Sequence, residues 1–482
     1  MDSELFRAHA HEVADWLADY LRDVGRRPVL PPVAPGQIRS QLPADPPASG
    51  EPFEQLLADF DQLILPGITH WQHPGWFGYF PANASPPSIL AEMLTAGLAA
   101  QCMSWQTSPA ATELEQHVMG WLRDLLGLPA DFTGVIQDTA STSTLVALLT
   151  ARERATDFAA GVRGLDDTAA PPLTVYTSAE AHSSVAKGVK LAGFGLDRLR
   201  SIETDQDYAV RPDRLAQALE YDRRAGFKPA CVVATVGTTS STALDPLRPI
   251  GELCREYGAW FHVDASYAGS AAVLPDFRWI LDGVELADSF VVNPHKWLLV
   301  NFDCSAYFVR DVDALLHTFQ ASPEYLRTAR DAEVVNFRDW GIQLGRRFRA
   351  LKLWFVIRSY GVDGLRAMVR RHIELAAEFR RWVDASPEFE AMAPTPLALV
   401  CFRWHPVGVD DGAALDELNR RVLAAINATG SVFLTHTLLG GRYVLRLAVG
   451  QWQTTEADVS RAWRVIQQAA AELAAAPAES AR

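Results

Sequence analysis

Short apolar runs alternate with helical patterns through the middle of this 482-residue chain, and this alternation limits its fold more than any other feature. From about residue 88, runs rich in β-branched and aromatic residues lie at 173–178, 230–237, 259–266 and 288–294. Stretches with helical spacing separate them, among them 111–128 and 249–258. Strands that are apolar on both faces and separated by helices are typical of a mainly parallel sheet covered on both sides. The sequence therefore predicts an α/β fold.

The segments on either side of this region follow other patterns. Residues 2–24 are amphipathic, as in a surface helix, and an extended proline-rich connector covers 28–47. After about residue 360 the order becomes helix, strand, strand, helix, with the strands at 397–404 and 442–450. We expect four parts: an N-terminal helical and extended segment at 1–87, a large domain at 88–360, a small C-terminal α+β domain at 361–475, and a frayed tail at 476–482.

Charge and composition exclude several classes of partner. A formal net charge of −14 at pH 7 argues against nucleic acid, whose phosphates are bound by Lys and Arg. No run of about 18 apolar residues suits a membrane span, and the first residues lack the regions of a signal peptide. The five cysteines form neither a CxxC pair nor a zinc pattern, so we expect free thiols, no metal and a cytoplasmic location.

Lys296 follows directly after the apolar strand that ends at Asn293-Pro294, in SFVVNPHKWLL. Desolvation lowers the pKa of an amine, and a neutral amine is the form that condenses with an aldehyde. A lysine whose stem lies along apolar surface with its ammonium in water explains the same pattern.

Asp264 ends a second apolar strand, in FHVDASYAG. A buried carboxylate without a partner is costly, and the protonated pyridine nitrogen of pyridoxal phosphate (PLP) is a suitable partner. Asp264 and Lys296 both lie at the carboxyl ends of strands, which line the ligand crevice of an open α/β sheet. A helix cap or a turn is the alternative role for Asp264.

Two further segments follow strands. Asp138-Thr139-Ala140-Ser141 lies where a short strand meets a helix, and free N–H groups with small hydroxyl residues there bind phosphate well. Capping of the helix by Thr139 or Ser141 gives the same pattern. His182 follows the strand at 173–178, where a stacking or acid–base role is reasonable, although a lone histidine is more often structural.

Together these segments resemble the group II PLP-dependent decarboxylases, and most closely the aromatic L-amino acid decarboxylases. The resemblance runs from about Trp71 to Trp463 and is carried by NPHKWLLVNFDCSA, HVDA-YAGSA, AHSSV, SWQTSPAATELE and LGRRFRALKLWFV. It implies the fold of PLP-dependent transferases of fold type I, with a mainly parallel, seven-stranded sheet and helices on both faces. It also implies a homodimer whose active site is shared between the chains, with the segment 1–87 taking part in dimerisation.

The resemblance assigns roles to individual residues. Lys296 matches the Schiff-base lysine, Asp264 the carboxylate that pairs with the pyridine nitrogen, and His182 the histidine stacked on the cofactor ring. Tyr325 matches the tyrosine of a mobile loop that reaches the partner's active site and is taken to protonate the substrate carbon. The other cofactor-binding positions that it implies are Thr139, Ala140, Ser141, Thr239, Asn293 and His295.

The implied substrate positions are Trp71, Tyr79, Phe80, Pro81, Ala82, Met103 and His182. Such a set gives an aromatic side chain an apolar pocket, although core packing alone also explains the aromatic residues. Ala82 replaces a common Thr and Met103 a common aromatic residue, which leaves the choice of ring open. Asp138 replaces a usual Gly beside the phosphate, where its charge would repel the ligand, so we expect it to point away or to cap the helix.

We therefore expect PLP-dependent decarboxylation of an aromatic L-amino acid, namely tryptophan, 5-hydroxytryptophan, tyrosine, DOPA or phenylalanine, to the arylalkylamine and CO2. An aromatic aldehyde synthase, which also deaminates oxidatively, is the nearest alternative; such relatives tend to change the loop tyrosine or the stacking histidine, and both are present here. A PLP-binding protein without catalysis is a second alternative. An acidic-substrate decarboxylase is a third, but it needs a cationic pocket where 71–81 offers aromatic residues.

Overall fold

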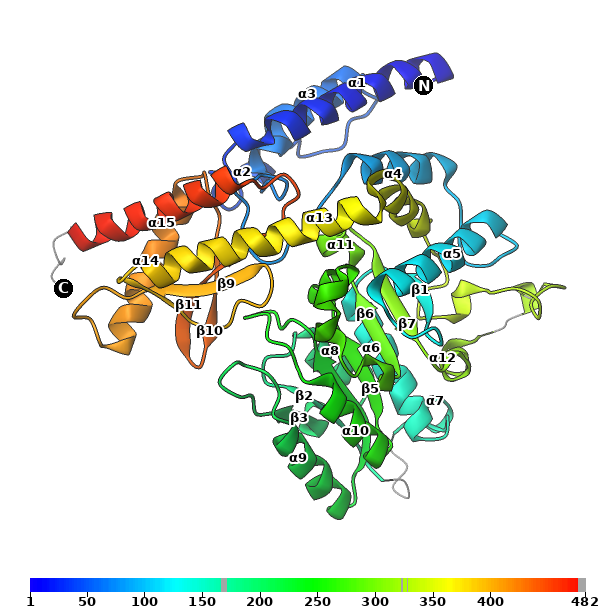
Figure 1. Ribbon diagram of the computed structural model, residues 1–482. Coiled ribbons are helices and arrows are strands. Elements are labelled where there is room, and N and C mark those ends of the chain that lie inside the picture. The colour runs from blue at the N-terminus through cyan, green and yellow to red at the C-terminus, as the bar shows by residue number, and fades with distance from the viewer. Residues whose placement is uncertain (166–170, 322–323, 327, 476–482) are drawn as a thin grey trace. The chain divides into compact units, whose positions relative to one another are not determined.

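The structure is a computed structural model that describes residues 1–165, 171–321, 324–326 and 328–475 (Figure 1). The chain divides into two compact units, the larger formed by Ala82–Arg380 with Ala391–Cys401, and the smaller by Met1–Pro81, Arg381–Glu390 and Phe402–Arg482. The predicted domain boundaries after residues 87 and 360 stay predictions. The predicted frayed tail at 476–482 lies outside the described residues.

Seven strands of the described residues form one sheet in the larger unit, in the order β1-β7-β6-β5-β4-β2-β3 (Figure 1). They are β1 (Thr133–Gln137), β2 (Leu173–Ser178), β3 (Leu199–Ile202), β4 (Lys228–Thr235), β5 (Trp260–Asp264), β6 (Ser289–Val292) and β7 (Ser305–Val309). The strands β3, β2, β4, β5 and β6 pair in parallel, while β7 runs antiparallel to both β1 and β6. The predicted mainly parallel sheet is confirmed; β3 and β7 were not predicted.

Helices cover this sheet, and α6 packs across its centre. Val146 and Ala147 of α6 share one buried apolar cluster with Val233 of β4 and Trp260 of β5. The helices of this unit are α4 (Pro86–Leu98), α5 (Pro109–Leu126), α6 (Ala140–Ala155), α7 (Ala160–Arg163), α8 (Ser184–Leu191), α9 (Pro212–Arg224), α10 (Leu247–Tyr257), α11 (Pro294–Trp297) and α12 (Val312–Phe319). The long α13 (Arg349–Ala385) begins in this unit and is kinked at Gly361, whose φ of 66° only glycine adopts without strain.

The smaller unit joins the start of the chain to its end. Phe77 N–H donates to the carbonyl of Phe433 (3.0 Å), and Ala448 N–H donates to the carbonyl of Phe77 (3.0 Å). The helices of this unit are α1 (Ser3–Asp23), α2 (Gln37–Gln41), α3 (Phe53–Asp59), α14 (Gly412–Ala428) and α15 (Glu456–Ala475). The connector at 28–47, which was predicted to be extended, contains the short helix α2.

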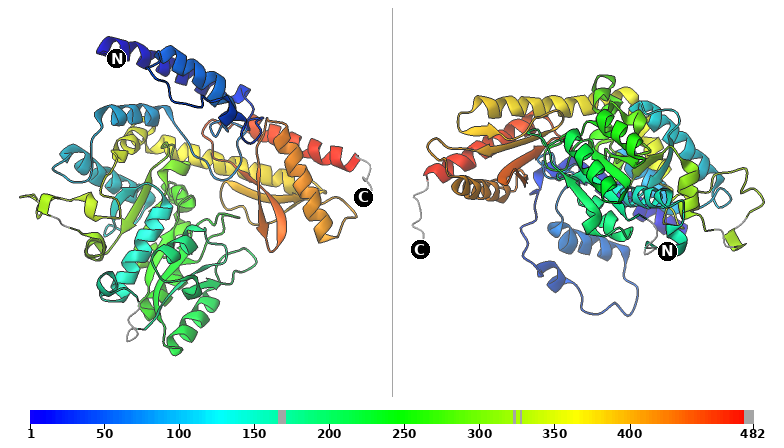
Figure 2. Two further views of the ribbon diagram at one scale, coloured as in Figure 1. Left: turned by 180° about the vertical axis from the view of Figure 1, so that it is seen from behind. Right: turned by 90° about the horizontal axis from the view of Figure 1, so that it is seen from below.

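A second sheet of the described residues has four strands in the order β10-β11-β9-β8. They are β8 (Phe389–Ala391), β9 (Leu399–Trp404), β10 (Thr435–Leu439) and β11 (Arg442–Ala448). Helix α14 packs against β11, and α15 lies beside α14 (Figure 2). Strands were predicted at β9 and β11 but not at β8 and β10. Within the described residues, no helix combines the length and the apolar character that crossing a membrane requires.

A buried ion pair fixes the edge of the larger sheet. The guanidinium of Arg346 lies 2.6 Å from the carboxylate of Glu115 on α5, and both side chains are buried. Glu115 also accepts from Ile136 N–H (2.8 Å), and Arg346 donates to the Ile136 carbonyl (2.6 Å). The pair therefore holds α5, the edge strand β1 and the segment before α13 together.

We predict that Arg346→Ala lowers the free energy of unfolding by about 3–5 kcal/mol, because it leaves the Glu115 carboxylate buried without its partner. Urea unfolding followed by circular dichroism measures the change. The matched control is Arg123→Ala, since Arg123 pairs with Asp124 at the surface and such pairs contribute about 0–1 kcal/mol. Equal effects of the two substitutions would contradict the prediction.

Candidate active site

The chemically active residues of the larger unit lie at or just after the carboxyl ends of its strands, which are on one side of the sheet. Asp264 is the last residue of β5, and it pairs with Val291 of β6. Lys296 lies on α11, which starts two residues after β6 ends. Because β7 is antiparallel to both β1 and β6, β1 runs in the direction of β6, so the α6 N-terminus after β1 lies at the same edge. The segment with His182 follows β2, which is parallel to β4.

Lys296 is held by its backbone and only partly exposed at its side chain. Its N–H donates to the carbonyl of Asn293 (2.9 Å), and its carbonyl accepts from Asn83 Nδ2 (2.9 Å). Burial lowers the pKa of the Lys296 amine, while the negative charge of Asp264 acts in the opposite direction. A lysine with its ammonium in bulk water would keep its ordinary pKa.

The Asp264 carboxylate is buried and held by its own turn. Its Oδ1 accepts from the Ser266 N–H (3.1 Å) and from the Ser266 hydroxyl. The alternative of a turn-forming role therefore describes part of what this residue does. Its charge also raises the pKa values of Lys296, His182 and His262 against the effect of burial. Asp264 is thus the negative centre of this edge of the sheet.

The N-terminus of α6 is capped by Thr139, whose Oγ1 accepts from Thr142 N–H (3.5 Å). Asp138 bends back: its Oδ1 accepts from Thr139 N–H (2.6 Å), and its Oδ2 accepts from Gln343 Nε2 (3.1 Å). Ala140 and Ser141 are the first two residues of the helix. Thr139 rather than Asp138 therefore caps α6, and the expectation that Asp138 points away from a phosphate stays a prediction.

Two serine hydroxyl groups connect the start of α6 to Asn293, the residue directly before α11. The Ser305 hydroxyl donates to Asn293 Oδ1 (2.7 Å) and lies 3.4 Å from the hydroxyl of Ser143 on α6. All three residues are buried. They fix the phosphate-binding candidates relative to α11.

The His182 ring is oriented by the start of α8. Its Nδ1 accepts from the Ser184 N–H (3.2 Å) and lies 2.9 Å from the Ser184 hydroxyl. Partial burial lowers its pKa most, Asp264 raises it, and Lys296 and Lys187 lower it further. The residue as a whole is exposed, which leaves the imidazole accessible to a ligand.

The remaining cofactor candidates differ in their surroundings. Thr239 lies in the turn that follows β4. His295 is buried, and its Nδ1 accepts from the Cys304 N–H (3.0 Å). Burial, followed by the charge of Lys296, lowers the pKa of His295 to about 3, so its ring is neutral at pH 7. Through its hydrogen bond to Cys304, His295 holds the loop that precedes β7.

The expected substrate residues are divided between the two units. Ala82 and Met103 belong to the larger unit, and both are partly exposed. Trp71, Tyr79, Phe80 and Pro81 belong to the smaller unit. There the Trp71 ring stacks on Tyr79 with centroids 5.7 Å apart, and it lies 4.3 Å from the ring of Trp76. The sequence had not singled out Trp76.

Arg446 was also missed, although it is the one charge inside the apolar run YVLRLAVG of β11. It is buried, and its guanidinium donates to Thr435 Oγ1 (3.0 Å) and lies 5.5 Å from the centre of the Phe80 ring. The aromatic stretch therefore has a cation beside it, which the sequence interpretation of 71–81 did not include.

Tyr325 lies on a short 3₁₀ turn, Glu324–Leu326, and its side chain is 77 % exposed in the single chain.

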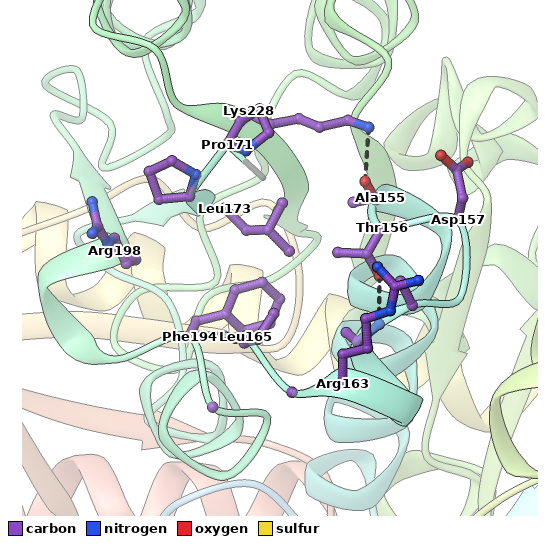
Figure 3. Close-up of a pocket in the computed structure, with 15 residues that line it drawn as sticks. Ala155, Thr156, Asp157, Arg163, Leu165, Pro171, Leu173, Phe194, Arg198 and Lys228 are labelled. Atoms are coloured by element: carbon purple, nitrogen blue, oxygen red, sulfur yellow. Dashed lines mark hydrogen bonds between the residues drawn. The ribbon is translucent and has the colours of Figure 1, made fainter. Parts of the chain in front are cut away.

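A separate cavity of about 730 Å³ (Figure 3) lies near the starts of β2 and β4. These are the opposite ends of the strands from the ends near which Lys296 lies. The residues that line it include Arg163, Leu173 and Lys228, and it contains none of the expected site residues. Among the described residues, no cluster of His, Cys, Asp and Glu suits a metal ion.

The residues at the sheet edge fit the needs of PLP. The cofactor aldehyde requires an amine of lowered pKa, which Lys296 provides. Its pyridine nitrogen requires a buried carboxylate, which Asp264 provides. Its phosphate suits the start of α6, where N–H groups and the helix dipole favour an anion.

Comparison with known proteins agrees with this fit. Residues 35–405 match the family model described as the pyridoxal-dependent decarboxylase conserved domain. The chain is 45% identical to phenylacetaldehyde synthase of Arabidopsis thaliana, over 98% of this chain and 97% of that protein. It is 43% identical to tryptophan decarboxylase TDC2 of Camptotheca acuminata, over 98% and 95%. The crystal structure of Oryza sativa TDC with PLP and tryptamine superposes with a TM-score of 0.95 at 38% identity, covering 98% of this chain and 99% of that one.

A family model that spans most of the chain, relatives above 40% identity over nearly full length and a matching fold all lead to one assignment. The chain belongs to the pyridoxal-dependent decarboxylase family and is a PLP-dependent carboxy-lyase.

Proposed function

We propose that this enzyme decarboxylates an aromatic L-amino acid to the arylalkylamine and CO2. The observation that carries the proposal is the grouping of Lys296, Asp264 and His182 at the carboxyl edge of the sheet. The 43% identity to a tryptophan decarboxylase supports an aromatic substrate. A panel of tryptophan, 5-hydroxytryptophan, tyrosine, DOPA and phenylalanine, with the amine as the measured product, tests the proposal and ranks these substrates.

In this proposal three residues hold and tune the cofactor. Lys296 would bind it through its amine, whose lowered pKa favours the neutral form that condenses with an aldehyde. Asp264 keeps the ring nitrogen protonated, since its buried carboxylate is stabilised by a neighbouring positive charge. When bound, PLP supplies an electron sink for the pair of electrons left when the bond between Cα and the carboxylate breaks. His182 would stack on the ring, in the orientation set by Ser184.

The phosphate is proposed to bind at the start of α6, with Thr139, Ala140 and Ser141 contributing. Asn293 supports this position through Ser305 and Ser143. Thr239 and His295 complete the proposed cofactor residues. The proposed substrate contacts remain His182, Trp71, Tyr79, Phe80, Pro81, Ala82 and Met103.

An aromatic rather than an acidic substrate is favoured by the surroundings of Arg446. An acidic side chain needs a cation as its partner, and Arg446 is the cation that lies beside the aromatic stretch. The guanidinium already donates to Thr435 and lies over the Phe80 ring, where a cation–π contact stabilises it. Its charge is therefore engaged with protein groups.

We further propose that the enzyme works as a homodimer with a shared active site. Helix α4 carries exposed apolar side chains at positions i, i+3, i+4 and i+8, namely Leu90, Met93, Leu94 and Leu98. Such a stripe on one helix face is typical of a surface covered by a partner. The exposed Tyr325 fits a residue that acts in the second chain, with Met103, and its hydroxyl would donate the proton to Cα.

An aldehyde synthase is the second candidate, because the 45% identical relative is a phenylacetaldehyde synthase. That reaction converts the amino acid, O2 and water to the aldehyde, CO2, NH3 and H2O2. The two identities, 45% and 43%, are too close to decide. Tyr325 and His182 are both present, which favours the amine.

The proposed location is the cytoplasm. All five cysteines lie in the described part of the chain, each is buried, and no disulfide joins any two of them. Free thiols persist in a reducing compartment.

We predict that Lys296→Ala abolishes amine formation and removes the visible absorption band of bound PLP, because no other amine holds the aldehyde. Absorption spectra and amine chromatography measure both effects. Lys190→Ala, which changes an exposed lysine at the end of α8, is the control and should retain both signals. Amine formation by the Lys296 variant would disprove the assignment.

We predict that Tyr325→Phe lowers the rate of amine formation by about 10²–10⁴-fold, the usual contribution of a general acid. The fraction of product released as aldehyde with H2O2 should rise at the same time. Tyr221→Phe is the control, since Tyr221 is also highly exposed but lies on α9. An unchanged amine rate in the Tyr325 variant would remove this residue from the mechanism.

A further inference from the structure

Asp331 lies six residues after Tyr325, and its carboxylate accepts several hydrogen bonds. Its Oδ1 accepts from the Thr328 hydroxyl (2.5 Å) and from Asn336 Nδ2 (3.1 Å). Its Oδ2 accepts from the Thr328 N–H (3.1 Å) and from a guanidinium nitrogen of Arg338 (3.4 Å). The bonds from Thr328, aided by the charge of Arg338, hold the pKa of Asp331 below its ordinary value, so it is an anion at neutral pH.

The partners of Asp331 are themselves anchored to the segment that contains Met103. Asn336 Oδ1 accepts from the Trp105 N–H (3.1 Å), and the Arg338 N–H donates to the Met103 carbonyl (2.8 Å). Asn336 and Arg338 are buried, whereas Asp331 is partly exposed. One carboxylate thus links the chain after Tyr325 to a buried frame.

The position of Thr328 limits the reach of Tyr325. Thr328 is the third residue after Tyr325, and an extended chain of three residue steps spans about 10 Å at most. Thr328 is held to Asp331 by its hydroxyl, by its N–H and by a bond from Asp331 N–H to its carbonyl (3.3 Å). It is therefore a fixed point from which the tyrosine extends.

We infer that Asp331 is a positioning residue for Tyr325, and that through Asn336 it also sets the position of the segment Met103–Trp105. This inference rests on the proposed function, in which Tyr325 protonates Cα and Met103 contacts the substrate. The role inferred for Asp331 is exerted through Thr328 and Asn336, with which it forms hydrogen bonds. Its loss would leave Tyr325 chemically intact but poorly placed, so protonation would slow more than substrate binding weakens.

Asp331→Ala and Thr328→Val test the inference, with Asp213→Ala as the matched control. Asp213 is likewise an arginine-paired carboxylate at the surface, bound to Arg211 (2.7 Å) and remote in sequence from Tyr325. The first variant removes the shared acceptor. The second removes one hydroxyl and keeps the backbone, so it decides the question if the first does not fold.

Amide hydrogen exchange is the readout that does not depend on activity. We expect roughly tenfold faster exchange of the Thr328 amide and faster exchange of the Trp105 amide, since hydrogen bonds to a charged group are strong enough to protect amides to that extent. Trp105 is far from the substitution in sequence, so its response reports the link through Asn336. The Asp213 variant should match the wild type at both amides.

The catalytic readout is the split between kcat and KM and the ratio of amine to aldehyde. We expect kcat for amine to fall at least tenfold in Asp331→Ala, KM to change less, and the aldehyde fraction to rise. Suppose that Tyr325→Phe impairs the enzyme, but that Asp331→Ala and Thr328→Val keep the wild-type amide exchange and the wild-type ratio of amine to aldehyde. That result would overturn the inference and leave the proposed function standing. No amine from the wild type with any aromatic amino acid would overturn the proposed function and the inference with it.

Discussion

The buried carboxylate of Asp264 must be compensated by hydrogen bonds or positive charge, and the geometry around it follows from this need. Ser266 provides two hydrogen bonds to one oxygen. His262, two residues earlier on β5, does not provide charge: burial lowers its pKa to about 4, and its Nδ1 lies 2.9 Å from the Ser289 hydroxyl. The Lys296 amine also has a lowered pKa. The protonated pyridine ring of bound PLP is the positive charge that we propose as the partner of Asp264.

The same constraint explains why these residues could be found from the sequence. A charge beside four or five apolar residues is costly unless it is paired or hydrogen-bonded, so Asp264 at the end of β5 and Lys296 just after β6 stand out. The sheet then brings both to one edge, because parallel strands end on the same side. Pattern alone left Thr139 open between capping and phosphate binding, and the structure shows that it does cap α6.

Other features lay beyond the sequence patterns for physical reasons. The strand β7 is only five residues long and follows closely on the segment of Lys296, so the apolar pattern did not mark it as a separate strand. Arg446 contacts Phe80, which is distant in the chain. Asp331 is held by hydrogen bonds, for example with Asn336, that no sequence periodicity encodes. The antiparallel direction of β7 and the joining of residues 76–77 to 433 and 448 are likewise long-range pairings.

The pairing of Phe77 with Phe433 and Ala448 has a consequence for biosynthesis. The first 81 residues leave the ribosome well before the strand that they pair with, and more than 300 residues of the other unit are made in between. Domains generally fold as units during synthesis, so the larger unit can form its sheet while the N-terminal aromatic segment still lacks its partners. Closing so long a loop is slow, which makes completion of the smaller unit a late step. The aromatic stretch from Trp71 to Tyr79 therefore stays without these partners on the nascent protein until the last strands are made.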